Sequence, residues 1–226
     1  DLNIMEKVWG NSYQKNNSQI FDIQDDIVEN LISELGIEID DKDHLQAISN
    51  PTDNLTAYDE LLKQKNNFYI VVKDYEALTN FIKINDAIIE KDPEYADALV
   101  FQAGTLCGYY FYYSEKHSRE EWLEILNRAV SLTEKAVGID AENQLGLSLR
   151  PMILMMLNFV TPSTSKMMLN SRKALLALNQ LSKKYPDNYL TKYALGNYYN
   201  IKSLAPIIAD ESDGEDALNY LTEACQ

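Results

Sequence analysis

Apolar residues recur at helical spacing along most of this chain, and short polar segments interrupt them. The spacing predicts a first helix from Ser18 to about Leu35, which Gly36 ends. After a polar connector, four consecutive pairs of helices are predicted: 54–69 with 74–91, 96–113 with 118–138, 144–159 with 163–184, and 188–204 with 213–225. We therefore expect an all-α protein built from antiparallel helix pairs.

Two of the predicted helices begin with a capping-box pattern. In this motif a hydroxyl and a carboxylate three residues apart satisfy free N–H groups of the first turn. Ser118 with Glu121 forms one such pattern, and Ser212 with Glu215 forms the other.

An internal repeat emerges when the ends of the second helices are superposed. The clearest copy lies within 174–199, where an apolar helix face ends at Pro186 and another helix begins at once. The repeated positions are Ala174, Leu178, Leu181 and Pro186; Ala129, Thr133, Ala136 and Ala141; Phe81, Asn85, Ile88 and Pro93; and Ala217, Leu221 and Ala224. Pro93 and Ala141 are 48 residues apart, and Ala141 and Pro186 are 45 apart.

These spacings resemble tetratricopeptide repeats, whose unit is a pair of antiparallel helices. Leu195, Gly196 and Tyr199 match the first helix of that unit, although Lys192 stands where the family usually has Trp. The resemblance implies a right-handed α-solenoid of about four helix pairs over 54–226, with repeats longer than the usual ~34 residues. It also implies a non-catalytic scaffold that binds a protein or peptide.

A second resemblance covers residues 1–60. Four segments are similar to the junction between a TolB-like domain and tetratricopeptide repeats in bacterial multidomain signalling proteins: Lys7-Val8-Trp9-Gly10-Asn11-Ser12-Tyr13, 20–27, Pro51-Thr52-Asp53-Asn54 and Ala57-Tyr58. Those proteins carry cyclase, kinase or winged-helix domains elsewhere. The resemblance implies that 1–15, which reads as a short strand or hairpin end, is the tail of a truncated domain. It makes 16–53 a linker helix with a polar connector, and it favours an extracytoplasmic location.

The net charge of −15 narrows the choice of partner. A strongly acidic chain is repelled by nucleic acid and by anionic membrane surfaces, so we expect neither. A basic or apolar protein partner is compatible with this charge. No apolar run of 18 residues predicts a membrane span. No signal peptide is recognisable after Asp1, and we expect a fragment of a longer protein.

The sequence shows no constellation of catalytic or metal-binding residues. His44 and His117 lie in polar segments that we expect to be exposed, and neither has a Cys or a second His at ligand spacing. Cys107 reads as a small core residue. The acidic run 210–216 fails as a calcium loop, because Gly214 falls at position 5 and Leu221 at position 12. We therefore expect no cofactor, no metal and no enzyme activity in this chain itself.

The register set at Leu195 and Gly196 predicts which side chains line a binding groove on the first helix of each pair. These are Asp59, Lys63, Asn66, Asp97, Val100, Gly104, Leu145, Ser148, Met152, Met155, Tyr193, Asn197 and Asn200. The aromatic run 109–113 is interpreted either as core or as a second binding surface. Two alternatives stay open: a small-ligand pocket formed by this run and the methionines near 152–168, or self-association into a homo-oligomer.

Overall fold

The computed structural model describes residues 20–36, 51–204 and 209–225. The chain divides into two compact units, 1–55 and 56–226. In the first unit, α1 (Ile20–Leu35) ends at Gly36, whose φ of 60° is the left-handed conformation that glycine adopts easily. The strand or hairpin predicted within 1–15, the helix start predicted at Ser18 and the polar connector around His44 lie outside the described residues.

The remaining helices fall close to the predicted ranges. They are α3 (Leu55–Val71), α4 (Tyr75–Lys91), α5 (Ala96–Tyr113), α6 (Arg119–Ile139), α7 (Gln144–Val160), α8 (Thr164–Lys184), α9 (Tyr189–Ser203) and α10 (Asp213–Ala224), with a 3₁₀ turn η2 (Ser114–Lys116) between α5 and α6. No β-strand occurs in the part of the chain that the structure describes. The all-α prediction is therefore confirmed.

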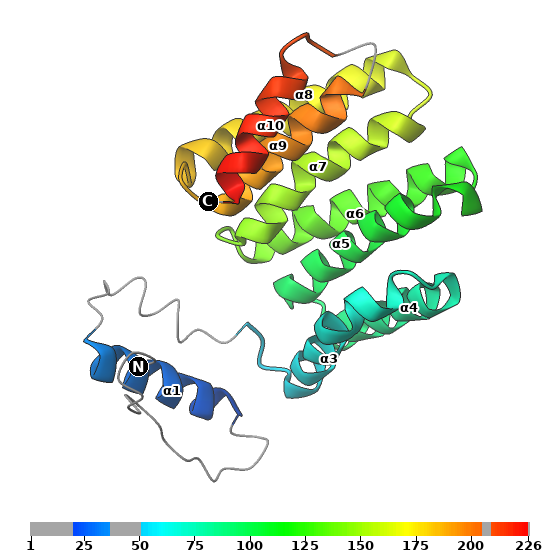
Figure 1. Ribbon diagram of the computed structural model, residues 1–226. Helices are drawn as coiled ribbons and strands as arrows, with labels where there is room; N and C mark the ends of the chain where they lie inside the picture. Colours follow the sequence, from blue (N-terminus) through cyan, green and yellow to red (C-terminus); the bar gives the residue numbers. More distant parts are fainter. Residues whose placement is uncertain (1–19, 37–50, 205–208, 226) are drawn as a thin grey trace. The chain divides into compact units, whose positions relative to one another are not determined.

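From α4 onward, helices that follow one another in sequence pack against each other. The pairs α5–α6, α7–α8 and α9–α10 are in contact, and α4–α5, α6–α7, α5–α7 and α7–α9 link one pair to the next. Figure 1 shows these helices lying side by side. The Phe68 ring joins α3 to its neighbours, with centroids 6.0 Å from those of Phe81 on α4 and Phe101 on α5.

The first three repeated positions lie in the core in the three earlier copies, whereas the fourth, at Pro93, Ala141 and Pro186, is exposed. Ala174, Leu178 and Leu181 are at most 3% exposed, and the matching residues of the two earlier copies are also buried. In the last copy only Ala217 is buried, while Leu221 and Ala224 stay partly exposed. Three copies of the pattern thus place the same helix face against neighbouring helices.

One of the two predicted helix caps is present. The Glu121 backbone N–H donates to Ser118 Oγ at 3.2 Å, and the Ser118 N–H donates to Glu121 Oε2 at 2.8 Å. These hydrogen bonds from Ser118 lower the pKa of Glu121.

The second capping-box prediction, at Ser212 and Glu215, is wrong. Ser212 has helical dihedral angles and makes no side-chain cap. Instead, the buried carboxylate of Asp213 holds the turn before α10, because it accepts from the Asp210 N–H at 2.5 Å and from Lys202 Nζ at 2.9 Å.

Gly196 allows α9 and α10 to approach closely. A Cβ atom added to Gly196 would lie 2.6 Å from Leu221 Cγ and 3.1 Å from the Leu221 backbone nitrogen. Gly138, near the end of α6, has no atom within 4 Å of the same position. The two glycines therefore form a matched pair, of which only one is required by packing.

We predict that Gly196→Ala lowers the free energy of unfolding by about 1–3 kcal/mol, because the methyl group overpacks the α9–α10 contact. Gly138→Ala should instead stabilise the protein by about 0.5–1 kcal/mol, because alanine loses less entropy in a helix. Urea denaturation of both variants measures the difference. Equal effects would contradict the close approach of α9 and α10.

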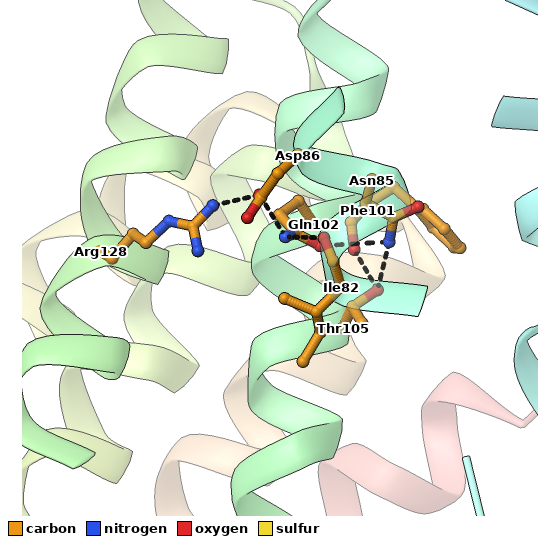
Figure 2. A network of polar contacts seen from close by, with 7 residues as sticks. All are labelled: Ile82, Asn85, Asp86, Phe101, Gln102, Thr105 and Arg128. Atoms are coloured by element: carbon orange, nitrogen blue, oxygen red, sulfur yellow. Dashed lines mark hydrogen bonds and ion pairs between the residues drawn. The ribbon is translucent and has the colours of Figure 1, made fainter. Parts of the chain in front are cut away.

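A buried polar network joins α4, α5 and α6 (Figure 2). Asn85, Gln102 and Thr105 are at most 1% exposed. Asn85 Nδ2 donates to Gln102 Oε1 at 3.1 Å, and Gln102 Nε2 donates to Asp86 Oδ1 at 2.6 Å. The Arg128 guanidinium on α6 pairs with the same Asp86 oxygen. Because buried polar groups must be satisfied, this network favours one register of the three helices.

We predict that Gln102→Leu, which conserves size but removes the amide, costs about 1–3 kcal/mol of unfolding free energy. Asn85 then loses one acceptor and Asp86 loses one donor. Asn179→Leu, an exposed site on α8, should change stability by less than about 0.5 kcal/mol. Urea denaturation measures the free energy of unfolding of both variants. If Gln102→Leu leaves it unchanged, the network contributes nothing to stability.

Candidate binding face on α5 and α7

Packing leaves α7 partly exposed along an apolar stripe, and Gln144, Leu147 and Arg150 are partly exposed elsewhere on the helix. Its neighbours bury Gly146, Ser148, Pro151, Ile153, Leu154, Met155, Leu157, Asn158 and Val160. The stripe runs at spacings of four and three residues and consists of Leu145, Leu149, Met152, Met156 and Phe159. Leu145 is 50% exposed and Phe159 is 40% exposed, whereas the three residues between them are partly buried. All five side chains are apolar along the whole length of the helix.

The helix α5 carries an equivalent stripe. Asp97, Phe101, Gly104, Gly108 and Phe111 follow the same spacing, and each precedes its counterpart on α7 by 48 residues. Phe111 is 77% exposed, and the other four residues are partly buried. The 48-residue interval found in the sequence therefore also relates the two exposed stripes.

The α5 stripe meets the α7 stripe at Gly104, whereas Gly108 faces α3. A Cβ atom on Gly104 would lie 3.7 Å from Leu149 Cδ2 of α7, and one on Gly108 would lie 3.3 Å from Phe68 Cζ of α3. Between the Phe101 and Phe111 rings, this side of α5 therefore carries no side chain of its own. We call the set Phe101, Phe111, Leu145, Leu149, Met152, Met156 and Phe159 the apolar face.

The structure corrects three of the predicted groove residues. Val100, Ser148 and Met155 are at most 3% exposed and belong to the interior. Val100 Cγ2 lies 3.2 Å from where a Cβ on Gly146 would be, so α7 covers it. The exposed line passes instead through residues one position later, Phe101, Leu149 and Met156. The predicted groove positions follow the register of α9. On α5 and α7 the neighbouring helices cover a different side of the helix, so those positions are buried there.

The other predicted residues reach the surface to different degrees. Asp59, Lys63, Asn66, Leu145, Tyr193 and Asn200 are exposed, and Asp97, Gly104, Met152 and Asn197 are partly buried. Most of the polar ones already have partners. Lys63 pairs with Asp59 within α3, Asp97 Oδ2 accepts from Lys65 at 3.2 Å, and Asn197 donates to the Tyr193 carbonyl at 2.8 Å. The methionines and leucines of α7 are therefore the better-supported contact residues.

Comparison with known proteins does not assign this face. No protein-family model, curated protein or solved structure matches the chain. Within residues 20–36, 51–204 and 209–225, no group of three or more His, Cys, Asp or Glu side chains is placed to hold a metal ion. Among the helices described, none is long and apolar enough to cross a membrane.

The aromatic run 109–113 is divided between core and surface. Tyr109 is 5% exposed, whereas Phe111 and Tyr112 are exposed. The prediction that His117 lies in an exposed polar segment holds for its neighbours Lys116 and Ser118, whereas its own side chain is partly buried. Its Nε2 lies 2.7 Å from Tyr109 Oη, and its ring centroid lies 4.9 Å from that of Trp122. Sequence reasoning missed this cluster because η2 turns the chain back onto α5.

The Tyr109 phenol makes this cluster sensitive to alkaline pH. Burial, together with the hydrogen bond to Tyr75, raises the pKa of Tyr109 to about 12. An unfolded tyrosine has a pKa of about 10. The folded state therefore retains the proton more strongly, and this contribution is present below pH ~10 and is lost as pH rises towards ~12.

We predict that the urea midpoint of the native protein falls between pH 8 and pH 11 by more than that of Tyr109→Phe. The variant lacks the titrating group, while the other buried tyrosines are common to both proteins. Parallel pH dependences would contradict this role of Tyr109.

Proposed function

We propose that this chain is a non-catalytic helical scaffold that binds a protein or peptide segment on its apolar face. The observation that carries the proposal is the uninterrupted apolar stripe on α7, which contacts the α5 stripe at Gly104. Apolar side chains that reach one surface together mark interaction sites in soluble proteins, and here Leu145 and Phe159 are exposed while the stripe residues between them are partly buried. A helix or extended segment with apolar anchors would remove them from solvent.

The charge of the chain indicates the chemistry around those anchors. With a net charge of −15, the protein attracts basic segments and repels acidic ones. We infer a partner segment whose apolar residues are flanked by Lys or Arg. Apolar contacts would supply the affinity, and the flanking charges would speed association at low salt.

We further propose that the helix pairs stack as a right-handed solenoid of the tetratricopeptide type, within the interaction or sensor region of a bacterial signalling protein. The shared 48-residue interval of the buried positions and of the exposed stripes supports repeated units. Contacts between successive pairs are those expected of stacked repeats, each of which packs mainly on its neighbours. The extracytoplasmic location implied by the second resemblance belongs to the same proposal.

Selection from a random peptide library displayed on phage tests the binding face. We predict that the native protein enriches peptides with apolar anchors and basic flanks. Leu145→Gln combined with Phe159→Gln should reduce affinity for the selected peptides by at least about tenfold, because two exposed anchors' contacts are lost. Fluorescence anisotropy with a labelled selected peptide measures the dissociation constants.

The matched control is Leu176→Gln combined with Leu218→Gln. These residues are 55% and 66% exposed on α8 and α10, outside the apolar face. The control should bind as the native protein does. An equal loss of peptide affinity in both double variants would refute the apolar face as the binding site. So would selected peptides whose affinity neither double variant changes. Concentration-dependent dimerisation that only the face variant abolishes would show that a second copy of the chain occupies it instead.

A further inference from the structure

The helix α8 has a charge opposite to that of the whole protein. No Asp or Glu occurs between Glu142 and Asp187, although the chain contains 35 acidic residues. Within this interval α8 carries five cationic side chains: Lys166, Arg172, Lys173, Lys183 and Lys184. The two in the last turn suit the helix dipole, which favours cations at the C-terminus. The dipole does not account for the other three, which lie in the first and middle turns.

Four of these five cations are exposed and unpaired. Lys184 is the exception, because its Nζ lies 2.6 Å from Glu142 Oε1. None of the other four forms an ion pair with a residue that the structure describes; they are Lys166, Arg172, Lys173 and Lys183. Their positive charge is therefore available to a carboxylate from outside the described chain.

Apolar side chains share this outer side of α8. Met168 is 59% exposed, Leu169 is 50% exposed and Leu176 is 55% exposed. Arg172 lies three residues after Leu169 and four residues before Leu176, so these three side chains fall on one face of the helix. The opposite face carries the buried repeat positions of α8. We call the exposed set the cationic face: Met168, Leu169, Arg172, Lys173, Leu176 and Lys183.

We propose that the cationic face is a second docking surface, which binds an acidic segment of another protein. In that segment, Asp or Glu residues alternate with apolar ones. Arg172 offers a carboxylate two parallel N–H groups, and Lys173 and Lys183 add further positive charge. Leu169 and Leu176 contact the apolar side chains of the segment. No residue of the cationic face belongs to the apolar face, and the two surfaces prefer segments of opposite charge.

Other anionic partners fit the cationic face less well. Nucleic-acid bases stack on aromatic rings, and α8 contains no aromatic residue. Trp and Tyr, which sit at membrane interfaces, are therefore absent from it as well. An anionic membrane would also face the acidic remainder of the chain. A short segment meets only the local charge, because screening limits charge effects to about 8 Å at physiological ionic strength.

Peptide selection on the double variant Leu145→Gln, Phe159→Gln tests this surface separately from the apolar face. From a random library displayed on phage, we expect this variant to enrich peptides that combine Asp or Glu with apolar residues. The apolar face is disabled in the variant, so the result does not depend on the function proposed above. Failure to enrich any peptide, or enrichment of peptides without an excess of acidic residues, would overturn the proposal.

A charge-matched pair of variants locates the binding site. Arg172→Gln combined with Lys173→Gln should weaken the binding of a selected acidic peptide at least about fivefold, because two charge-assisted contacts are lost. Lys83→Gln combined with Lys135→Gln removes the same charge from exposed positions on α4 and α6, and it should bind as the native protein does. Fluorescence anisotropy measures both dissociation constants. An equal loss in both variants would show that only net charge matters and would refute the cationic face.

Two further measurements separate the acidic segment from other occupants. The native protein should not sediment with vesicles of phosphatidylserine and phosphatidylcholine. Sedimentation that Arg172→Gln combined with Lys173→Gln abolishes would overturn the proposal in favour of a lipid surface. Light scattering should show no self-association that the same variant abolishes, because two cationic faces repel each other in a symmetric dimer. Such self-association would instead place a second copy of the chain on α8.

Discussion

The packing of α7 against several helices at once is the constraint on which the rest of this structure depends. Its contacts with α5, α6, α8 and α9 bury most of its circumference and leave one apolar stripe partly exposed. A helix surrounded in this way must be apolar nearly all round. The side chains of the exposed stripe are therefore apolar as well, and they make up most of the proposed binding face.

Two local devices keep that packing in one register. Gly196 removes a side chain where α9 and α10 would otherwise collide. The amides of Asn85 and Gln102 place directional hydrogen bonds between α4 and α5, and Asp86 extends them to Arg128 on α6. Apolar contacts tolerate sliding, whereas a buried hydrogen-bond network does not. The positions of the exposed stripes follow from these fixed registers.

The proposed binding face uses one side of α7. That side presents leucine, methionine and phenylalanine to a partner that displaces water from them. On the opposite side of the helix, Arg150 pairs with Glu134 of α6. Because the face belongs to a helix that touches four others, a bound partner would act on a shared packing unit rather than on a loop.

The sequence by itself determined the features that depend on near neighbours along the chain. Helical periodicity located the helices, Ser118 and Glu121 formed their capping box, and the spacing at Ala174, Leu178 and Leu181 identified a buried face. Only the tertiary structure decided the features that depend on contacts between segments far apart in the sequence. Val100 and Met155 are buried because α5 and α7 have neighbours that α9 lacks. Buried Asp213, rather than Ser212, holds the turn before α10, because Lys202 of α9 donates a hydrogen bond to the Asp213 carboxylate. His117 meets Tyr109, and Arg150 meets Glu134, only once the chain has folded back, since no spacing along a helix records which helix will lie alongside.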